Sequence, residues 1–311
     1  MTTRRPLDAQ AIGLMLLLCF VWSVQQVALK AMAAEIKPLM QIALRSGGAA
    51  LLVYGFMRWR GERLSLADGI WRPGLAVGLL FALEFLMIGE GLRYTSAAHL
   101  VVFLYTAPLF AALGLHVLLP AERLARVQWL GVVLAFAGIA VAFLWEREPH
   151  ADWQAMLWGD VLALLAGAAW GATTVVVRTT RLAAINATQT LFFQLAVAGV
   201  LLTLAALGMG QAEFVLTPRV ALSLAFHAVV VAFASFLVWF WLLRHYLASR
   251  LGVFSFLTPL MGIVLGSYVL NEPIEPGFRS GALMVLTGIV LVSGYGWFGR
   301  FMPKHRTGPG A

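Results

Sequence analysis

The stretch Leu92–Leu119, LRYTSAAHLVVFLYTAPLFAALGLHVLL, returns later in the chain as Leu243–Leu270, LRHYLASRLGVFSFLTPLMGIVLGSYVL. At a shift of 151 residues the two stretches agree at nine of 28 positions, whereas composition alone gives about three coincidences. Pro108 and Pro259 are among the identities. A duplicated segment of this length indicates that the chain is built from two related halves.

Two further blocks extend this repeat toward both ends of each half, at shifts of 148 and 150 residues. The matched pairs are Trp22 and Trp170, Lys30 and Arg178, Gly131 and Gly281, and Gly138 and Gly288. Because the three blocks follow the same order, the repeat is expected to involve whole units rather than one helix. We therefore predict an N-terminal repeat at 1–150 and a C-terminal repeat at 151–311, integrated in one membrane domain.

The composition is that of a membrane protein. Hydrophobic residues make up 61% of the chain, charged residues only 12%, and the mean hydropathy is +0.87. Soluble domains carry about 25% charged residues, so almost none of this chain resembles a water-facing surface. The net charge of +8 is therefore attributed to basic residues beside the membrane spans that contact the lipid bilayer, rather than to a nucleic-acid-binding surface. Cys19 is the single cysteine, so no intrachain disulfide can form.

Clusters of charge, proline and glycine divide the sequence into segments of the length that spans a bilayer, about 20 apolar residues. Ten segments are expected, at 10–32, 38–57, 71–92, 96–119, 127–145, 155–178, 187–208, 219–243, 249–270 and 279–299. The predicted fold is an all-α polytopic membrane protein with ten transmembrane helices in two inverted five-helix repeats. The repeats are inverted because an odd number of spans makes the second half enter the membrane from the opposite side.

The distribution of Lys and Arg predicts the orientation. With the N-terminus in the cytoplasm, fifteen basic residues fall in cytoplasmic connections and tails and six fall outside. We expect a multi-pass protein of a bacterial-type cytoplasmic (inner) membrane with both termini in the cytoplasm. Residues 31–33 form an A-x-A sequence, but the preceding apolar stretch is long for a signal peptide and matches the sixth segment. We expect that stretch to be retained as a helix.

Short motifs in both halves are shared with a known family. They are Trp22-Ser23, Trp170-Gly171, Pro108-Leu109 with Glu122-Arg123-Leu124, and Pro259-Leu260 with Asn271-Glu272-Pro273. In this combination the chain resembles the EamA type of the drug/metabolite transporter superfamily, and within it the YddG-type exporters of aromatic amino acids and methionine. Ser23 departs from the glycine that usually follows the first tryptophan in that family. The resemblance implies a central cavity lined by the third, fourth, eighth and ninth segments, helped by the first and sixth.

The paired prolines are predicted helix kinks. Pro108 and Pro259 lie in mid-segment, where each removes a backbone donor and crowds the preceding turn. A symmetric pair of bent helices beside the central cavity can free carbonyl groups and support gating. The alternative is a static kink that only improves packing.

Ionisable residues within the segments are candidates for function, because such groups are costly in a membrane. Glu84 shares a helical face with Phe81 and Phe85 and either binds a cationic amine, exchanges a proton, or is a structural partner for Arg45 or a histidine. His227 either lines the path or is a satisfied interior histidine. No histidine has a second ligand at metal-site spacing, so we expect neither a metal nor a cofactor.

Deep aromatic residues are the other candidate substrate contacts. Trp22 and Trp170 are repeat mates, Trp239 lies at similar depth, and Phe103 and Tyr105 belong to the fourth segment. Large aromatic faces can stack on an amphipathic ligand, although filling of the interior explains any one of them as well.

The sequence as a whole predicts a secondary transporter that exports small amphipathic metabolites, foremost aromatic and other hydrophobic amino acids, by alternating access. Transport is either passive or coupled to protons, with Glu84 as the candidate for coupling. The alternatives are a multidrug or nucleotide-sugar-type carrier and, in a different class, a membrane-embedded enzyme. The enzyme is disfavoured because neither H-E-x-x-H nor a pair of intramembrane aspartates occurs.

Overall fold

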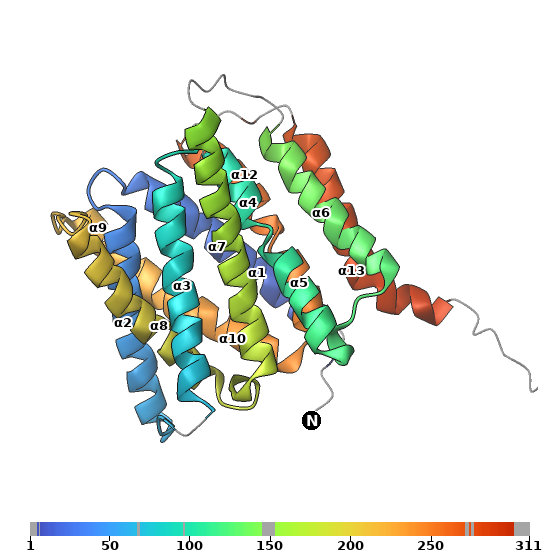
Figure 1. The fold of residues 1–311 in the computed structure, drawn as a ribbon, viewed down its shortest axis with the longest axis horizontal. Coiled ribbons are helices and arrows are strands. Elements are labelled where there is room, and N and C mark those ends of the chain that lie inside the picture. The colour runs from blue at the N-terminus through green and yellow to red at the C-terminus, as the bar shows by residue number, and fades with distance from the viewer. Residues whose placement is uncertain are drawn as a thin grey trace, which may run out of the picture.

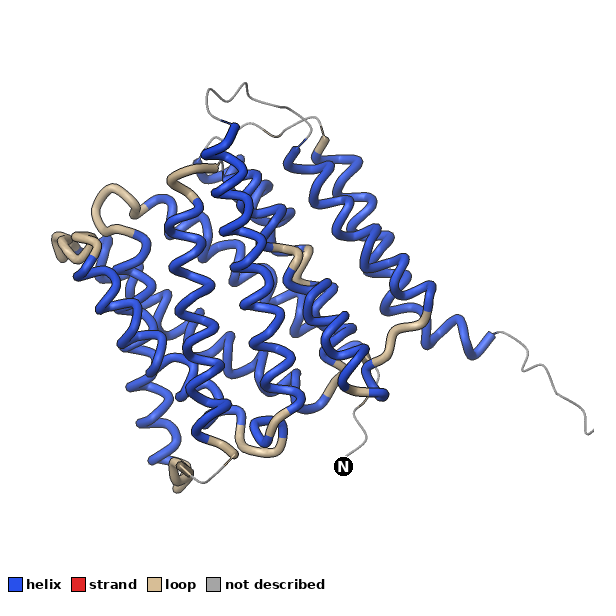
Figure 2. The backbone as a smooth tube through the Cα atoms, viewed as in Figure 1, coloured by secondary structure: helices blue, strands red, loops and turns tan. Residues whose placement is uncertain are grey.

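The computed structural model describes residues 5, 7–66, 69–95, 97–144, 153–270, 274 and 277–301, which are helical apart from short connections and two isolated β-bridges (Figure 2). In chain order the elements are α1 (Ala9–Ala31), α2 (Pro38–Trp59), α3 (Trp71–Gly91), α4 (Ala97–Leu104), α5 (Ala107–Leu118), η1 (Pro120–Glu122), α6 (Arg126–Leu144), α7 (Trp153–Thr179), η2 (Arg181–Ala183), α8 (Ala187–Gly208), α9 (Pro218–Ala225), η3 (Phe226–Ser235), α10 (Phe236–His245), α11 (Ala248–Phe254), α12 (Leu257–Leu270) and α13 (Phe278–Phe301). The helices form a bundle (Figure 1).

Within the described residues, eight helical stretches are long and apolar enough to cross a membrane, so the chain is an all-α polytopic membrane protein. They coincide with eight of the segments expected from the sequence. The other two segments contain α6 and α13, whose described apolar parts are the shorter stretches Arg126–Ala142 and Phe278–Val292. The count of ten spans therefore stays a prediction. The connection between the two predicted repeats, residues 145–152, lies outside the described residues.

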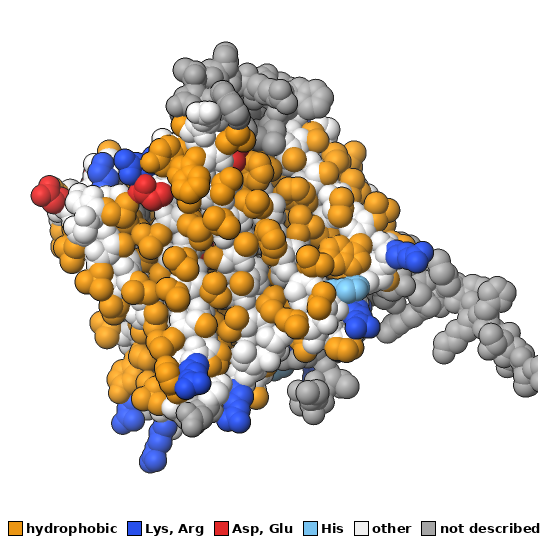
Figure 3. Space-filling model, in the orientation of Figure 1, with side chains coloured by type: hydrophobic (Ala, Val, Ile, Leu, Met, Phe, Trp, Pro, Cys, Tyr) orange, Lys and Arg blue, Asp and Glu red, His pale blue; other side chains and the backbone are white. Residues whose placement is uncertain are grey.

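Apolar side chains cover the middle of the face in Figure 3, and basic side chains gather along its lower edge. This lower edge is the end of the bundle where α2 ends and α3 begins, and Arg58, Arg60, Arg63 and Arg72 are all exposed there. We call the apolar surface in the middle of this face the apolar belt. It matches the interior of a bilayer, where an exposed charge is costly.

The chain breaks near both paired prolines. Tyr105 and Thr106 separate α4 from α5, and Ser255 and Phe256 separate α11 from α12. Pro108 follows in the first turn of α5, where its missing N–H costs little. Hydroxyls add hydrogen bonds at each break, since Thr106 Oγ1 donates to the Phe103 carbonyl at 2.6 Å and Ser255 Oγ donates to the Gly252 carbonyl at 2.6 Å. Each expected kinked helix is thus two helices in the structure.

α6 and α13 lie side by side at one edge of the bundle (Figure 1). Their backbones approach closely at two pairs of glycines. A Cβ at Gly131 would lie 2.7 Å from the Gly288 carbonyl oxygen, and a Cβ at Gly138 would lie 2.6 Å from the Gly281 carbonyl oxygen. The two contacts are reciprocal, because the repeat matches Gly131 to Gly281 and Gly138 to Gly288.

The remaining helices enclose the interior. α2 packs on α8, α3 packs on α7 and α8, α5 packs on α7, and α1 packs on α12. One span carries a π-helical stretch, η3, between α9 and α10. Such a stretch shifts the register of side chains relative to a regular α-helix and is often found near functional sites.

The start of the described chain is tied to the α10–α11 junction. The Arg5 backbone N–H donates to the His245 carbonyl at 2.9 Å, and the Tyr246 hydroxyl donates to the Asp8 carboxylate at 2.9 Å. Asp8 also accepts the backbone N–H of Ala11 at 2.8 Å. These hydrogen bonds, first that from Ala11, hold the pKa of Asp8 below its usual value. We call Arg5, Asp8 and their partners the N-terminal strap.

Candidate functional site

A cavity of about 580 Å³ lies inside the bundle, between α1, α2, α3, α4, α7, α8, α10 and α12. Its size falls in the range of small-molecule sites, and most of its wall is apolar. Among the residues expected to bind substrate, those in its wall are Trp22, Phe81, Glu84, Phe85, Tyr105, Trp170 and Trp239. Pro259 is also in the wall, whereas Pro108 lines a small neighbouring pocket with Trp170 and Gly252.

The deep aromatic rings are held edge to face. Trp22 and Trp239 lie 5.8 Å apart between ring centroids at 75°, and Tyr105 and Trp170 lie 5.5 Å apart at 84°. The Trp22 indole N–H donates to Ser235 Oγ at 2.9 Å. The rings are therefore fixed by their neighbours, and an apolar ligand meets a preformed aromatic surface.

Two expected site residues, Phe103 and His227, lie outside this wall. His227 is fully buried, its Nδ1 lies 2.7 Å from the Ser223 carbonyl and its Nε2 lies 3.4 Å from the Gln25 carbonyl. Its ring is thus held by polar contacts between helices. Phe103 packs half-buried against the main core, and its carbonyl accepts the Thr106 hydroxyl.

Two opposite charges are buried beside the cavity. Glu84 is 8% exposed and lies in the wall, and Arg45 on α2 is 1% exposed. The Arg45 guanidinium carbon lies 5.1 Å from the ring centroid of Phe85 and 6.0 Å from that of Phe236. None of its three nitrogens has a hydrogen-bond partner among the described residues. Glu84 and Arg45 interact electrostatically without a hydrogen bond between them.

From the sequence, Arg45 is expected only as a partner for Glu84. Its position within a span nevertheless indicates a functional role, because an arginine at membrane depth is functional by default. The wall also contains two uncharged polar side chains, Gln25 and Gln194. The side-chain oxygen of each is buried and has no hydrogen-bond partner in the described part of the chain. The cavity therefore combines an aromatic part with a polar part whose hydrogen bonds are unfilled.

The two ends of the cavity differ. At one end it reaches Gln26, Pro38 and Leu92, which are exposed where α1 and α3 end and α2 begins. At the other end it stops at Val177 and Leu243, which are buried. The cavity is thus accessible from one end of the bundle and closed at the other.

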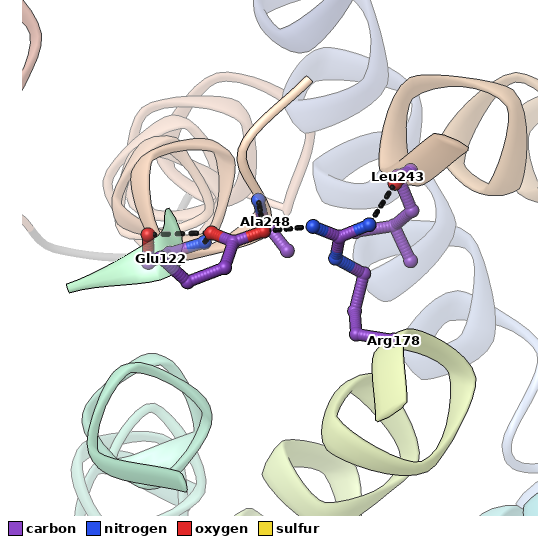
Figure 4. Close-up of polar contacts among 5 residues, drawn as sticks. Glu122, Arg178, Leu243 and Ala248 are labelled. Atoms are coloured by element: carbon purple, nitrogen blue, oxygen red, sulfur yellow. Dashed lines mark hydrogen bonds and ion pairs between the residues drawn. The ribbon is translucent and has the colours of Figure 1, made fainter. Parts of the chain in front are cut away.

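A buried ion pair lies next to the closed end (Figure 4). Glu122 in η1 pairs with Arg178 at the end of α7, and Arg178 also donates to the Leu243 carbonyl at 3.1 Å. The same carboxylate accepts the backbone N–H groups of Ala248 at 3.2 Å and Ser249 at 3.1 Å, and the Ser249 hydroxyl at 2.8 Å. We call this set the Glu122 clasp. It joins a residue of the first half to three elements of the second.

No group of three or more His, Cys, Asp or Glu side chains in the described part of the chain is placed to hold a metal ion. The functional features are therefore the cavity, its buried charges and the clasp. Together they form a small-molecule compartment within a membrane bundle that is open at one end.

Known proteins share both the sequence pattern and the fold. The chain is similar to the uncharacterized transporters YoaV and YvbV of Bacillus subtilis (strain 168), at 24% identity over 87% of this chain and 92% of YoaV, and at 26% over 90% of each for YvbV. It is also similar to an uncharacterized transporter of Archaeoglobus fulgidus, at 25% identity over 90% of this chain and 96% of that protein. A solved structure, described as a crystal structure of a protein, has the same fold with a TM-score of 0.78, at 17% identity over 92% of this chain and 96% of its own.

The EamA-like transporter family matches the chain twice, at residues 9–144 and again at residues 157–294. These two matches together cover most of the sequence, and the named relatives are transporters. A transporter family implies a small-molecule substrate and a lipid bilayer around the protein, which agrees with the cavity and the apolar belt. The chain therefore belongs to the EamA-like transporter family.

Proposed function

We propose that this chain is a secondary transporter that exports aromatic and other hydrophobic amino acids, as the YddG-type exporters do, by alternating access. The observation that carries the proposal is the aromatic cavity with buried charges, open at one end of the bundle and closed at the other. An amphipathic amino acid needs apolar surface for its side chain and polar groups for its backbone atoms. The wall offers both.

The proposed architecture is ten helices in two inverted repeats, 1–150 and 151–311. The two family matches begin 148 residues apart, which is the shift that aligns Trp22 with Trp170. The reciprocal glycine contacts of α6 and α13 support a two-fold relation, because exchanging the repeat mates turns one contact into the other. An inverted pair of this kind allows one binding site to open toward either membrane face.

The proposed orientation places both termini in the cytoplasm of a bacterial-type inner membrane. The basic lower edge of the bundle supports it, because Lys and Arg collect on the cytoplasmic side. In that orientation the cavity opens outward and the Glu122 clasp closes the cytoplasmic side. Export requires the clasp to separate, so that substrate enters from the cytoplasm before the halves rock back to the outward-open arrangement.

Purified protein in liposomes is expected to accelerate the movement of tryptophan, phenylalanine and methionine over protein-free liposomes. The measurement is counterflow of each radiolabelled amino acid, with lysine and aspartate as hydrophilic members of the panel. In a separate measurement, net uptake that is equal with and without a pH gradient indicates passive transport, and net uptake that depends on the gradient indicates proton coupling, with Glu84 as the first candidate. Absence of counterflow for tryptophan, phenylalanine and methionine contradicts the proposed substrate class.

The break at Pro259 is proposed to be part of the rocking motion. Pro259→Ala restores a backbone donor that can bond to the Ser255 carbonyl, so α11 and α12 are expected to merge toward one helix and counterflow to slow severalfold. Pro108→Ala tests the repeat mate. Pro218→Ala is the matched control, because Pro218 is an exposed first residue of α9, where proline is not needed for a bend. Counterflow at the wild-type rate in folded Pro259→Ala and Pro108→Ala protein leaves both residues as static kinks.

A further inference from the structure

Arg45 lies on the face of α2 that lines the cavity. Pro38 and Ile42 are in the cavity wall, and Arg45 follows Ile42 by three residues, which places the three on one side of the helix. The rings that lie within about 6 Å of its guanidinium, Phe85 and Phe236, are themselves in the wall. Arg45 is itself not a residue of the wall and its nitrogens are buried, so the guanidinium lies at the α2 side of the cavity, directly behind these two rings, and a ligand reaches it when one of the rings rotates aside.

This guanidinium lacks the partners that a buried charge requires. Arginine stays protonated in proteins and carries five N–H donors, yet no described residue accepts a hydrogen bond from any of the Arg45 nitrogens. An isolated buried charge is costly unless an anion also accepts its hydrogen bonds. Glu84 supplies electrostatic attraction but accepts none of the hydrogen bonds. The donor set is that of a site for a carboxylate, which arginine binds through two parallel hydrogen bonds.

The acceptors lie on the same side of the cavity. Phe81, Glu84 and Phe85 occupy one face of α3 in the wall, so the Glu84 carboxylate is next to the ring that covers Arg45. Gln194 of α8 adds a buried amide oxygen that is unpartnered within the described ranges. A carboxylate and an amide oxygen, both acceptors, suit an ammonium group.

We infer that Arg45 and Glu84 form a site for a zwitterion, in which Arg45 binds the carboxylate and Glu84 binds the ammonium group of a free α-amino acid. The side chain of that amino acid then lies against the rings of Trp22 and Trp239. This inference rests on the proposed function and specifies its substrate class: amino acids with both backbone groups unblocked, rather than amines or carboxylic acids with the same ring. Arg45 and Glu84 form no direct hydrogen bond with each other, because each of them bonds to one end of the ligand instead.

The test uses four indole compounds as competitors of tryptophan counterflow in liposomes that contain the full chain. Tryptophan has both groups, tryptamine only the ammonium group, indole-3-propionate only the carboxylate, and 3-methylindole neither. The three analogues are expected to need at least about tenfold higher concentration than tryptophan for half inhibition, because each leaves a buried charge unpaired. If tryptamine or indole-3-propionate competes as well as tryptophan, the zwitterion site is wrong, while the cavity and the proposed transport of amino acids stand.

Substitutions of Arg45 and Glu84 test which residue binds which charged group of the ligand. Arg45→Gln is expected to remove the preference for tryptophan over tryptamine but to keep the preference over indole-3-propionate, and Glu84→Gln is expected to do the reverse. Arg45→Lys should restore part of the first preference, because it returns the charge without the paired geometry. Ser46→Ala is the control: Ser46 is the next residue of α2, its hydroxyl bonds to the Ile42 carbonyl at 2.7 Å, and both preferences should persist.

The outcomes separate the two proposals. Unchanged preferences in folded Arg45→Gln protein, judged by a single gel-filtration peak, overturn the role of Arg45. If this variant does not fold, the wild-type competition series alone still decides whether both groups are required. Counterflow of no amino acid at all overturns the proposed function and the zwitterion site together.

Discussion

Replacing Glu122 with glutamine is expected to lower the free energy of unfolding by about 3–5 kcal/mol, because the change leaves the buried Arg178 charge without its counter-ion. Glutamine keeps the volume of the side chain but accepts more weakly from the N–H groups of Ala248 and Ser249. The measurement is thermal unfolding in detergent, which should show a large fall in the midpoint temperature relative to the wild type.

The double variant Glu122→Gln with Arg178→Met separates the ion pair from the other contacts. Removing both charges should recover most of the lost stability, since no unpaired charge remains. The closed end should nevertheless open more often in the double variant than in the wild type, because the ionic contact between the halves is absent there. In a Cys19→Ser background, Val177→Cys should then react faster with a water-soluble thiol reagent. Equal midpoints for wild type and Glu122→Gln contradict the energetic role of the clasp.

Gly138→Ala is expected to destabilise the protein by about 1–3 kcal/mol, because its methyl group would meet the backbone of α13 rather than a flexible side chain. The Gly281 carbonyl oxygen would lie 2.6 Å from the new carbon, so α6 and α13 must move apart. Gly131→Ala should have a similar effect, because its contact with Gly288 is the reciprocal one. The double variant Gly131→Ala with Gly138→Ala should lose more stability than either single variant.

Gly55→Ala is the matched control for these variants. Gly55 lies on α2, and no atom of the described residues beyond its own helix lies within 4 Å of the position that a methyl group would take there. Alanine should therefore be neutral or slightly stabilising at this position. If Gly138→Ala and Gly55→Ala unfold at the same temperature, the close approach of α6 and α13 does not contribute to stability.

The extents of the helices could be predicted closely because they depend on apolar length and on local end signals. The segments expected at 38–57 and 187–208 are α2 (Pro38–Trp59) and α8 (Ala187–Gly208), the first of which begins at a proline. The π-helical stretch η3 could not be foreseen. Its sequence is as apolar as that of an ordinary span, and the hydrogen-bond register within a span depends on the helices around it.

The direction of side chains was harder to predict than the helices themselves. A bilayer and a protein interior are both apolar, so a helix such as α8 carries little contrast between its two faces. Trp22 and Trp170 could be selected through the repeat, whereas Phe103 could not be distinguished from a residue of the wall. Glu122 is near a segment end, where charges are ordinary, and its partner Arg178 is 56 positions away in the sequence. Only the packed structure brings them together.

The N-terminal strap makes the two ends of the bundle unequal. A carrier assembled from two identical halves would spend equal time facing either side, since neither arrangement would have an extra contact. The hydrogen bonds of Arg5 and Asp8 to the α10–α11 junction lie at the closed end. Each 1.4 kcal/mol by which such contacts favour one arrangement over the other shifts the ratio of the two resting populations about tenfold. A few residues at the start of the chain can thus set the dwell time of an otherwise balanced cycle.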